Sequence, residues 1–170
     1  MNHRDLNKIM KLLRWDAPKE VQNSLISEIA DDMDFDHSVF LQPLKDDYAD
    51  AGKMCWEGCA RIFQTMGYPR CAKYIDGFFV WIQDMNWPGA EIMEELLLSI
   101  PHDVFMVAYE RAIRDAVRSN YTMWLFILSM YVGMRKIKID DFSDKKSYQA
   151  IEGYLDRANE LLRLNNKLPT

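Results

Sequence analysis

The chain has 170 residues, 49% of them apolar, and carries a formal net charge of −5 at pH 7. A chain of this length buries about 70% of its unfolded surface when it folds, so its core needs no disulfide or structural metal. The acidic balance disfavours nucleic acid as a partner, because phosphate contacts need clustered Lys and Arg.

Two amphipathic helices are predicted in the first part of the chain, over 21–33 and about 48–66. Their apolar residues recur at steps of three and four, which is the spacing of one helix face. The residues before them, 1–15, mix acids and bases and have neither a long apolar core nor a small-residue cleavage site, so we expect no signal peptide. The apolar positions are Val21, Leu25, Ile26, Ile29, Ala30 and Met33 in the first helix and Ala51, Cys55, Gly58, Cys59, Ile62, Phe63 and Met66 in the second.

Acidic residues concentrate where the first of these helices ends. Eight of them fall between 28 and 50, against Lys45 alone. Such a run is typical of a solvated surface with acids at helix starts, but it can also attract a basic protein surface. The candidate partner-binding residues are therefore Asp31, Asp32, Asp34, Asp36, Asp46 and Asp47.

The third predicted helix, 71–85, is apolar on most sides and is expected to lie at the centre of the fold. It runs into the sequence WIQDMNWPGA (81–90), which predicts a corner between two helices rather than a binding site. Asn86 tolerates left-handed backbone geometry at a helix end, Pro88 suits the first turn of the next helix, and Trp87 is expected to pack between the two helices. The corner motif comprises Trp81, Asp84, Asn86, Trp87 and Pro88.

Three more helices and a connection are predicted after the corner. The connection places Ile137 and Ile139 on one side, and Ser143 with Asp144 predicts the start of a last amphipathic helix. The helices span 92–100, 105–117 and 123–134, the connection 135–141 and the last helix 143–165. The tryptophans lie on or beside apolar stripes and are expected in the core: Trp15, Trp56, Trp81, Trp87 and Trp124.

The corner sequence recurs along the chain. An offset of 52 residues aligns 32–35 with 84–87, and a fainter copy aligns 120–121 with 86–87. Each copy is a polar turn followed by an aromatic residue, with apolar arms on both sides. We therefore predict an all-α protein with an irregular HEAT-like helical repeat, made of stacked helix hairpins in a short α-solenoid. We expect a single domain over 1–170, with stacked hairpins over about 15–134 and a C-terminal packing helix over 143–165.

Two segments resemble a bacterial domain family of unknown function. They are WEGCARI (56–62) and FVWIQDMNWPGAEIMEELL (79–97), and the second contains the family's W-[LI]-Q-D-x-N-W-P-G-A motif. The resemblance covers about 15–99, and nothing after Ser99 is similar. It implies a helical domain similar to HEAT or armadillo repeats and supplies no catalytic residues. By analogy with such bacterial helical-repeat proteins, it implies a partner-binding protein, with an immunity-type antidote to a secreted toxin as one form.

The cysteine and histidine residues indicate the compartment and the metal content. Three cysteines are typical of a reduced, cytoplasmic protein, and Cys55 and Cys59 are expected as small buried hydrophobes on one helix. The three histidines are scattered, so neither a metal nor a cofactor is predicted. The longest apolar run, 123–132, is about half of what a bilayer crossing needs, so no membrane contact is expected.

Two classes of function remain open. The first is a protein–protein interaction module, an immunity-type protein among them, that binds an unidentified partner with a basic surface. The alternative is an enzyme acting on a small molecule or nucleic acid. Its candidate residues would be Asp84 and Asn86 beside His102, or the cluster Asp31, Asp32, Asp34 and Asp36, although acids in open turns do not have their pKa values driven apart. A cleft of some hundreds of cubic ångströms with convergent titratable groups would favour the enzyme, and a monomer and a homodimer are both compatible with the sequence.

Overall fold

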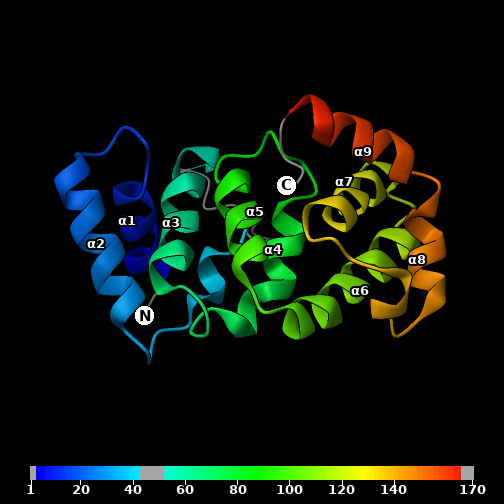
Figure 1. Cartoon of the computed structure of the whole chain (residues 1–170). Helices are drawn as coiled ribbons and strands as arrows, with labels where there is room; N and C mark the ends of the chain where they lie inside the picture. Colours follow the sequence, from blue (N-terminus) through cyan, green and yellow to red (C-terminus); the bar gives the residue numbers. More distant parts are fainter. Residues whose placement is uncertain (1–2, 43–51, 166–170) are drawn as a thin grey trace. The chain divides into compact units, whose positions relative to one another are not determined.

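The computed structural model describes residues 3–42 and 52–165 (Figure 1). Within these ranges the chain forms nine α-helices and four short 3-10 helices, and no strand. The prediction of an all-α protein is confirmed. The contacts within the chain cluster into two compact units, Met1–Ser99 and Ile100–Thr170, named unit 1 and unit 2. The single domain over 1–170 stays a prediction.

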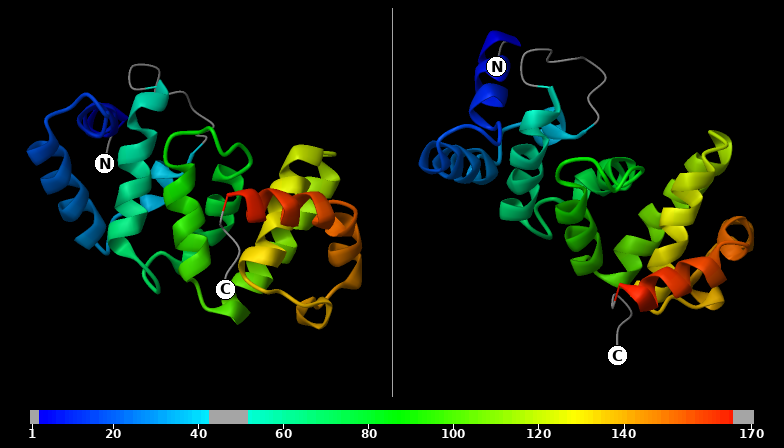
Figure 2. Two further views of the ribbon diagram at one scale, coloured as in Figure 1. Left: turned by 45° about the horizontal axis from the view of Figure 1, so that its top comes forward. Right: turned by 90° about the horizontal axis from the view of Figure 1, so that it is seen from above.

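Unit 1 is a set of helices in which α3 contacts both α2 and α5, α4 packs on α5, and α1 packs on α2. Figures 1 and 2 show α2, α3 and α5 side by side in successive views. The elements are α1 (His3–Leu12), α2 (Lys19–Asp31), η1 (His37–Phe40), η2 (Gly52–Cys55), α3 (Trp56–Met66), η3 (Ala72–Tyr74), α4 (Ile75–Trp81) and α5 (Ala90–Ser99).

Helix α1 was not predicted, although its apolar spacing is helical. Leu6, Met10 and Leu13 follow at steps of four and three and are almost fully buried. The chain at Leu13 lies so close to α3 that a Cβ at Gly58 would come within 2.2 Å of the Leu13 carbonyl oxygen. A glycine inside α3 therefore allows the end of α1 to touch it.

The predicted helices 48–66 and 71–85 are both shorter in the structure. α3 begins at Trp56 after the 3-10 helix η2, and residues 48–51 lie outside the described ranges. α4 occupies only Ile75–Trp81 and follows η3. Its central position agrees with the prediction, because Phe78, Phe79 and Trp81 are all 0% exposed.

Three residues of unit 1 that were predicted on an apolar face or in the core are exposed instead: Trp15, Met33 and Val21, of which Val21 is 44% exposed. Trp15 is 60% exposed, because it lies in the loop after α1, where only its backbone N–H is held, donating to the Met54 carbonyl oxygen at 2.9 Å. Met33 is 61% exposed, because α2 ends at Asp31 and the helical spacing that placed Met33 on the apolar face stops there.

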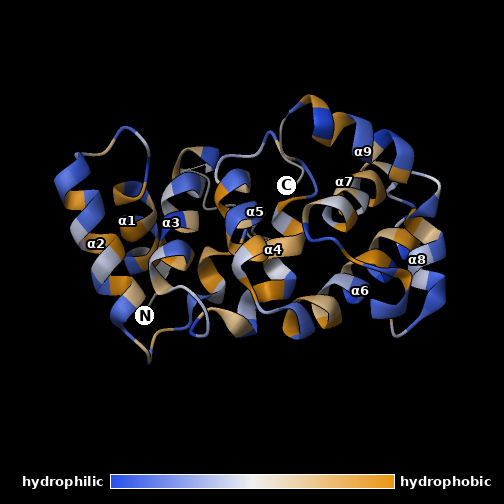
Figure 3. Ribbon diagram, viewed as in Figure 1, coloured by the Kyte–Doolittle hydropathy of each residue, from blue (hydrophilic) through white to orange (hydrophobic). Residues whose placement is uncertain are grey.

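Unit 2 is built around α7, which contacts α6, α8 and α9. Figure 3 shows few hydrophilic residues on α7, whereas α6, α8 and α9 each carry a hydrophilic side. The Tyr109 hydroxyl on α6 donates to the Leu128 carbonyl oxygen on α7 at 2.7 Å, and its complete burial raises the pKa of Tyr109. The elements are α6 (His102–Arg118), α7 (Thr122–Met134), η4 (Ile139–Asp141), α8 (Lys145–Glu152) and α9 (Leu155–Leu164).

The carboxyl-terminal third differs from the prediction in two ways. The single helix expected over 143–165 is two helices, because the chain turns at Gly153 and the Tyr154 N–H bonds the Ile151 carbonyl oxygen three residues back. Ile137 is buried and Ile139 is 46% exposed, so they do not share one side. Lys136, with φ of 54°, redirects the chain between α7 and that segment.

Among the described residues, no helix combines the length and the apolar character that a membrane crossing needs.

Candidate functional site

The corner motif lies in a turn between two helices. α4 ends at Trp81 and α5 begins at Ala90. The Trp81 ring is fully buried, and its Nε1–H donates to the Pro88 carbonyl oxygen at 3.1 Å. The Asp84 carboxylate accepts the Asn86 backbone N–H at 2.9 Å and its side-chain amide at 3.0 Å. Asp84 and Asn86 thus bond to each other and shape the turn.

The backbone of the corner differs from the expectation at two positions. The left-handed residue is Gly89, with φ of 84°, and not Asn86. Pro88 precedes α5 and does not lie in its first turn. A Cβ at Gly89 would lie 2.6 Å from the Ala60 Cβ on α3, so glycine is required both by the backbone geometry and by the close approach to α3.

Trp87 contacts α3, and its packing between α4 and α5 stays a prediction. It is half-buried and meets the Trp56 ring of α3 edge-on, with ring centroids 5.4 Å apart. The Lys53 Nζ lies 5.8 Å from the centroid of the Trp87 ring, within the range of a cation–π contact. The corner is therefore a joint that fastens α4 and α5 to α3.

The offset of 52 residues corresponds to a repeated turn. The Asp34 N–H donates to the Asp32 carboxylate at 3.1 Å, as the Asn86 N–H does to Asp84. Downstream the copies diverge, because the first continues into η1 and the second into α5. In the faintest copy Asn120 adopts φ of 52° between α6 and α7, the left-handed geometry expected for the polar residue of such a turn.

The acidic candidates that the structure describes, Asp31, Asp32, Asp34 and Asp36, are exposed. Asp31 pairs with Arg70 at 3.1 Å, with the Asp31 side chain 73% exposed. Asp36 accepts the Ser38 backbone N–H at 3.0 Å, and the hydrogen bonds from Ser38 lower the pKa of Asp36. Asp32 and Asp34 belong to the repeated turn, and Asp46 and Asp47 lie outside the described residues. The structure gives these carboxylates roles in turns and one ion pair, and their binding role stays a prediction.

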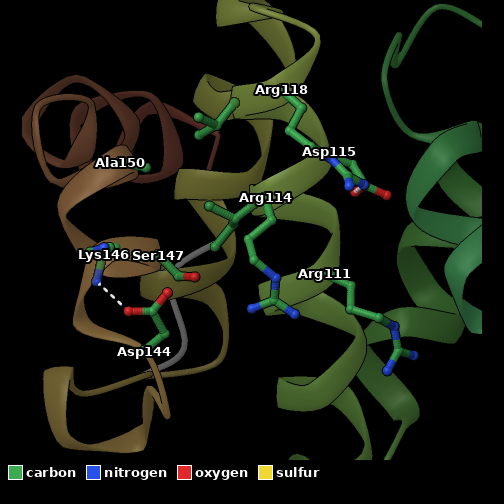
Figure 4. A pocket seen from close by; sticks show the side chains of 10 residues that line it. Arg111, Arg114, Asp115, Arg118, Asp144, Lys146, Ser147 and Ala150 are labelled. Atoms are coloured by element: carbon green, nitrogen blue, oxygen red, sulfur yellow. Dashed lines mark hydrogen bonds and ion pairs between the residues drawn. The ribbon is translucent and has the colours of Figure 1, made fainter.

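A cavity of about 590 Å³ lies between α6 and α8 in unit 2 (Figure 4). Its lining combines four cationic side chains, two carboxylates, three apolar side chains and one hydroxyl. We name it the cationic groove; it is lined by Arg111, Arg114, Arg118, Lys146, Asp115, Asp144, Ile113, Val117, Ala150 and Ser147.

The cations of the groove come largely from one face of α6. Arg111, Arg114 and Arg118 follow at steps of three and four, so their side chains project from the same side of the helix. Arg114 lies 3.6 Å from the Glu110 carboxylate, and Arg118 pairs with Asp115. Between them the apolar side of the cavity combines buried Ile113 with Val117, which is 49% exposed.

Glu110 holds the two walls of the groove together. Its carboxylate lies on α6 and is almost fully buried. It accepts three hydrogen bonds from the two residues just before α8. The donors are the Ser143 N–H at 2.7 Å, the Ser143 hydroxyl at 2.8 Å and the Asp144 N–H at 3.2 Å. Asp144 in turn accepts the Lys146 N–H at 3.0 Å and caps α8, as the sequence predicted. The start of α8 is thereby tied to α6 through hydrogen bonds.

Ser147 is the one buried hydroxyl in the wall of the groove. The residue is 2% exposed, and its Oγ has no hydrogen-bond partner among the residues that the structure describes. In Figure 4 the hydroxyl lies on the side of α8 that faces Arg114. Buried polar groups are almost always hydrogen-bonded, so this hydroxyl has unused hydrogen-bonding capacity in the wall of the groove.

The candidate enzyme residues interact with partners inside their own units. His102 begins α6, and its Nε2 lies 3.6 Å from the Asp141 carboxylate in a second cavity of about 400 Å³ that shares Arg111 and Arg114 with the groove. Asp84 and Asn86 belong to unit 1, where they bond to each other. In the described ranges no three His, Cys, Asp or Glu side chains are grouped as a metal site.

The cysteines belong to the core. Cys55, Cys59 and Cys71 are all free and buried. The expected burial of Cys55 and Cys59 is confirmed, but they do not share one helix, because Cys55 ends η2 and Cys59 lies in α3. Burial raises the pKa of Cys59 well above its ordinary value, while the hydrogen bond with Cys59 lowers the pKa of Cys55. Cys59 also donates to the Met10 sulfur at 3.6 Å, so its thiol joins α3 to α1.

The cationic groove was missed in the sequence because its charges are spread over a helix face. The most compact basic run in the sequence is Arg135, Lys136 and Lys138, in which Arg135 donates to the Ile100 carbonyl oxygen at 2.7 Å and lies 4.1 Å over the Phe105 ring. The signal for the groove is the recurrence of arginine at 111 and 114 inside the predicted helix 105–117 and at 118 directly after it.

The chain has no match among known proteins in any of three comparisons: no family model, no curated protein and no solved structure is similar to it. The resemblance of 56–62 and 79–97 to a bacterial family therefore stays a prediction.

Proposed function

We propose that the protein is a protein–protein interaction module that holds an acidic segment of a partner in the cationic groove. The observation that carries this proposal is the concentration of four cationic side chains around an apolar floor, in a chain whose net charge is −5. A local charge opposite to that of the whole chain directs a ligand to one place. Charge complementarity therefore favours an acidic ligand.

The chemistry of the lining favours binding over catalysis. A cavity of about 590 Å³ is within the range of enzyme clefts, so its size does not separate the two classes. Arginine and lysine side chains stay protonated near neutral pH and donate hydrogen bonds, but a protonated group cannot act as a base or nucleophile. Histidine and cysteine do not line this cavity, and its two carboxylates are engaged, because Asp115 pairs with Arg118 and Asp144 accepts the Lys146 N–H.

The apolar floor indicates how a partner segment binds. Val117 is half-exposed beside buried Ile113, with Ala150 on the opposite wall. A segment with an apolar side chain flanked by acids would cover this floor and meet the arginines at the rim, as amphipathic segments do in other binding grooves. The proposal therefore specifies an amphipathic acidic segment.

The acidic candidates of unit 1 are a second candidate interface, with the opposite charge. Asp31, Asp32, Asp34 and Asp36 are all exposed, which is compatible with the basic partner predicted from the sequence. Their carboxylates lie on turns, however, whereas the cations of unit 2 surround a cavity. For this reason the groove is proposed first.

The proposal also specifies the arrangement of the helices, the cellular compartment and the kind of partner. The helix hairpins stack in a HEAT-like manner, which the side-by-side arrangement of α2, α3 and α5 supports within unit 1. The protein works in the cytoplasm, which the buried free thiols support. The partner is a toxin-like protein that the module neutralises, which only the resemblance of 56–62 and 79–97 supports.

Charge reversal separates the two interfaces. The first variant carries Arg111→Glu, Arg114→Glu and Arg118→Glu, and the second carries Asp31→Lys, Asp32→Lys and Asp34→Lys. Wild type and both variants are used for affinity capture from the native cell, followed by measurement of binding to the purified partner. We expect the first variant to lose affinity by about 100-fold or more and the second to retain it, with helical content unchanged in both.

The opposite pattern, with loss in the second variant alone, would assign the interface to the acidic turn and overturn the proposal. If both variants bind the partner as tightly as the wild type does, neither surface is the interface. The wild-type affinity should also fall as salt is raised, because exposed charges are screened over about 10 Å at 0.1 M salt.

A further inference from the structure

The groove contains a position prepared for one strongly anionic group. Ser147 contributes a buried hydroxyl with no hydrogen-bond partner in the described part of the chain. Arg114 points into the space between α6 and α8, on the side where this hydroxyl lies (Figure 4). A ligand oxygen placed between them would accept from both.

The charges of the lining leave this position positive. The two carboxylates are already engaged, because Asp115 pairs with Arg118 and Asp144 accepts the backbone N–H of Lys146. Glu110, whose carboxylate lies 3.6 Å from Arg114, adds a third acid beside the four cations of the lining. The position stays positive and favours an anion.

A phosphate monoester fits this position better than a carboxylate does. It carries about −1.5 to −2 charge at pH 7 and three acceptor oxygens, whereas a carboxylate carries one charge and two oxygens. Arginine forks bind phosphate through paired N–H groups. Arg114 has five N–H donors, so it can keep its contact with Glu110 while it binds a second anion.

The first turn of α8 does not itself supply this site. Its Lys146 N–H is taken by the Asp144 side chain, and its Ser147 N–H bonds the Asp144 carbonyl oxygen at 3.0 Å. The donors that remain are the side chains of Ser147, Arg114 and Lys146. Recognition therefore depends on side chains that can be changed one at a time.

We propose that the anionic group held in the groove is the phosphate of a phosphoserine or phosphothreonine in the partner segment, bound by the Arg114 guanidinium and the Ser147 hydroxyl, with Arg111, Arg118 and Lys146 around it. This proposal rests on the proposed function and narrows it. A neighbouring apolar side chain of the segment covers Ile113 and Val117. The partner binds when it is phosphorylated and leaves when it is dephosphorylated.

The test uses three peptide libraries with the full-length protein. One has a fixed phosphoserine flanked by degenerate positions, and the others have serine or aspartate at that position. The best peptides of each library are then measured by fluorescence anisotropy. We expect the phosphoserine peptides to bind at least about tenfold more tightly than their serine and aspartate counterparts.

Ser147→Ala provides the decisive variant. It removes a hydroxyl that no described protein group accepts or donates to, so the melting temperature should stay equal or rise. Affinity for the phosphopeptide should fall by about fivefold to tenfold. The matched control is Ser129→Ala, because Ser129 is equally buried on α7 but donates to the Phe126 carbonyl oxygen and does not line the groove.

A second pair of variants keeps the test independent of folding. Arg114→Gln should lower phosphopeptide affinity by about 20-fold or more, while Arg163→Gln, at an exposed position of α9, should leave it unchanged. Both should retain helical content.

The outcomes separate this inference from the proposed function. Equal binding of phosphoserine and aspartate peptides would overturn the phosphate site and leave the acidic-segment module standing. Absence of binding by the peptides of all three libraries would overturn both. An unchanged affinity in Ser147→Ala together with loss in Ser129→Ala would also overturn the site.

Discussion

The two units fasten their helix joints by different physical means. In unit 1, residues 82–89 are held by shape: Trp81 is fully buried, and Gly89 lies against Ala60 of α3. In unit 2, the start of α8 is held by the buried Glu110 carboxylate, which accepts three hydrogen bonds from Ser143 and Asp144. The first joint depends on volume and the second on hydrogen bonds.

This difference indicates where function can reside. The corner of unit 1 is held by close packing against α3. Glu110 instead lies in the wall of a cavity and fixes α8 opposite the arginines of α6. The hydrogen-bonded joint therefore sets the width of the cationic groove, and a change there is expected to affect both stability and binding.

The largest expected loss of stability comes from a change at the joint of unit 1, residues 82–89, which we call the packed joint. Trp81→Ala removes a fully buried ring and its bond to the Pro88 carbonyl oxygen, and should lower the free energy of unfolding by about 3 to 5 kcal/mol. Urea denaturation measures the loss, and hydrogen exchange locates it. Hydrogen exchange should accelerate in α4 and α5 and change little in α8. Equal acceleration in α8 would show that the joints of the two units are not stabilised independently.

The second largest loss of stability is expected when Glu110, which holds the start of α8, is replaced. Glu110→Ala leaves the two backbone N–H groups of Ser143 and Asp144 without an acceptor and should lower the free energy of unfolding by about 2 to 4 kcal/mol. Exchange should accelerate at the first amides of α8. Affinity for the partner should fall as well, unlike in Trp81→Ala at temperatures where that variant stays folded.

Glu110→Gln is the milder companion variant. Its amide oxygen can still accept one of the bonds, and its loss should be about half that of the alanine variant. Identical exchange at Ser143 and Asp144 in wild type and both variants would show that the carboxylate does not hold α8.

A volume change in the packed joint should cost less than removal of its anchor. Gly89→Ala introduces a Cβ 2.6 Å from Ala60 at φ of 84°, and should lower the free energy of unfolding by about 1 to 3 kcal/mol. The matched control is Gly153→Ala: at φ of −64° a Cβ there meets nothing within 4 Å, so stability should stay equal or rise. Equal losses in both variants would indicate a general effect of glycine replacement rather than contact with α3.

The sequence predicted the packed joint far better than the hydrogen-bonded one. Tryptophan, proline and glycine act through local geometry, so 81–90 could be interpreted without knowing what it touches, and the repeat at 32–35 reproduces the same turn. Glu110 contacts residues 33 positions away, and its neighbours in sequence do not reveal this pairing. The groove was hidden for the same reason, because its walls come from segments that are distant in sequence.

Errors in the predicted core also have a physical reason. Met33 was placed in the core by extending helical spacing past the last residue of α2, and Trp15 by its position beside apolar residues, although it lies after the end of α1. An apolar pattern gives the face of a helix but not its last residue, since ends are set by turn bonds such as that from Asp34 N–H to Asp32. The acids of this segment thus end a helix, which explains part of their clustering.

The smallest expected loss of stability, in Trp87→Ala, shows whether this ring of unit 1 serves packing or partner binding. Trp87 is half-buried, with an edge-on contact to Trp56 and Lys53 near its ring, so Trp87→Ala should lower the free energy of unfolding by about 1 to 2 kcal/mol. Phe35, its counterpart in the repeat, stacks on Phe40 at 5.5 Å, and Phe35→Ala should cost a similar amount because both rings close the same turn. A loss below about 0.5 kcal/mol at Trp87 alone, together with weaker partner binding, would mean that its ring serves an interface. In that case the packed joint would carry function after all, and the contrast between the two units would no longer hold.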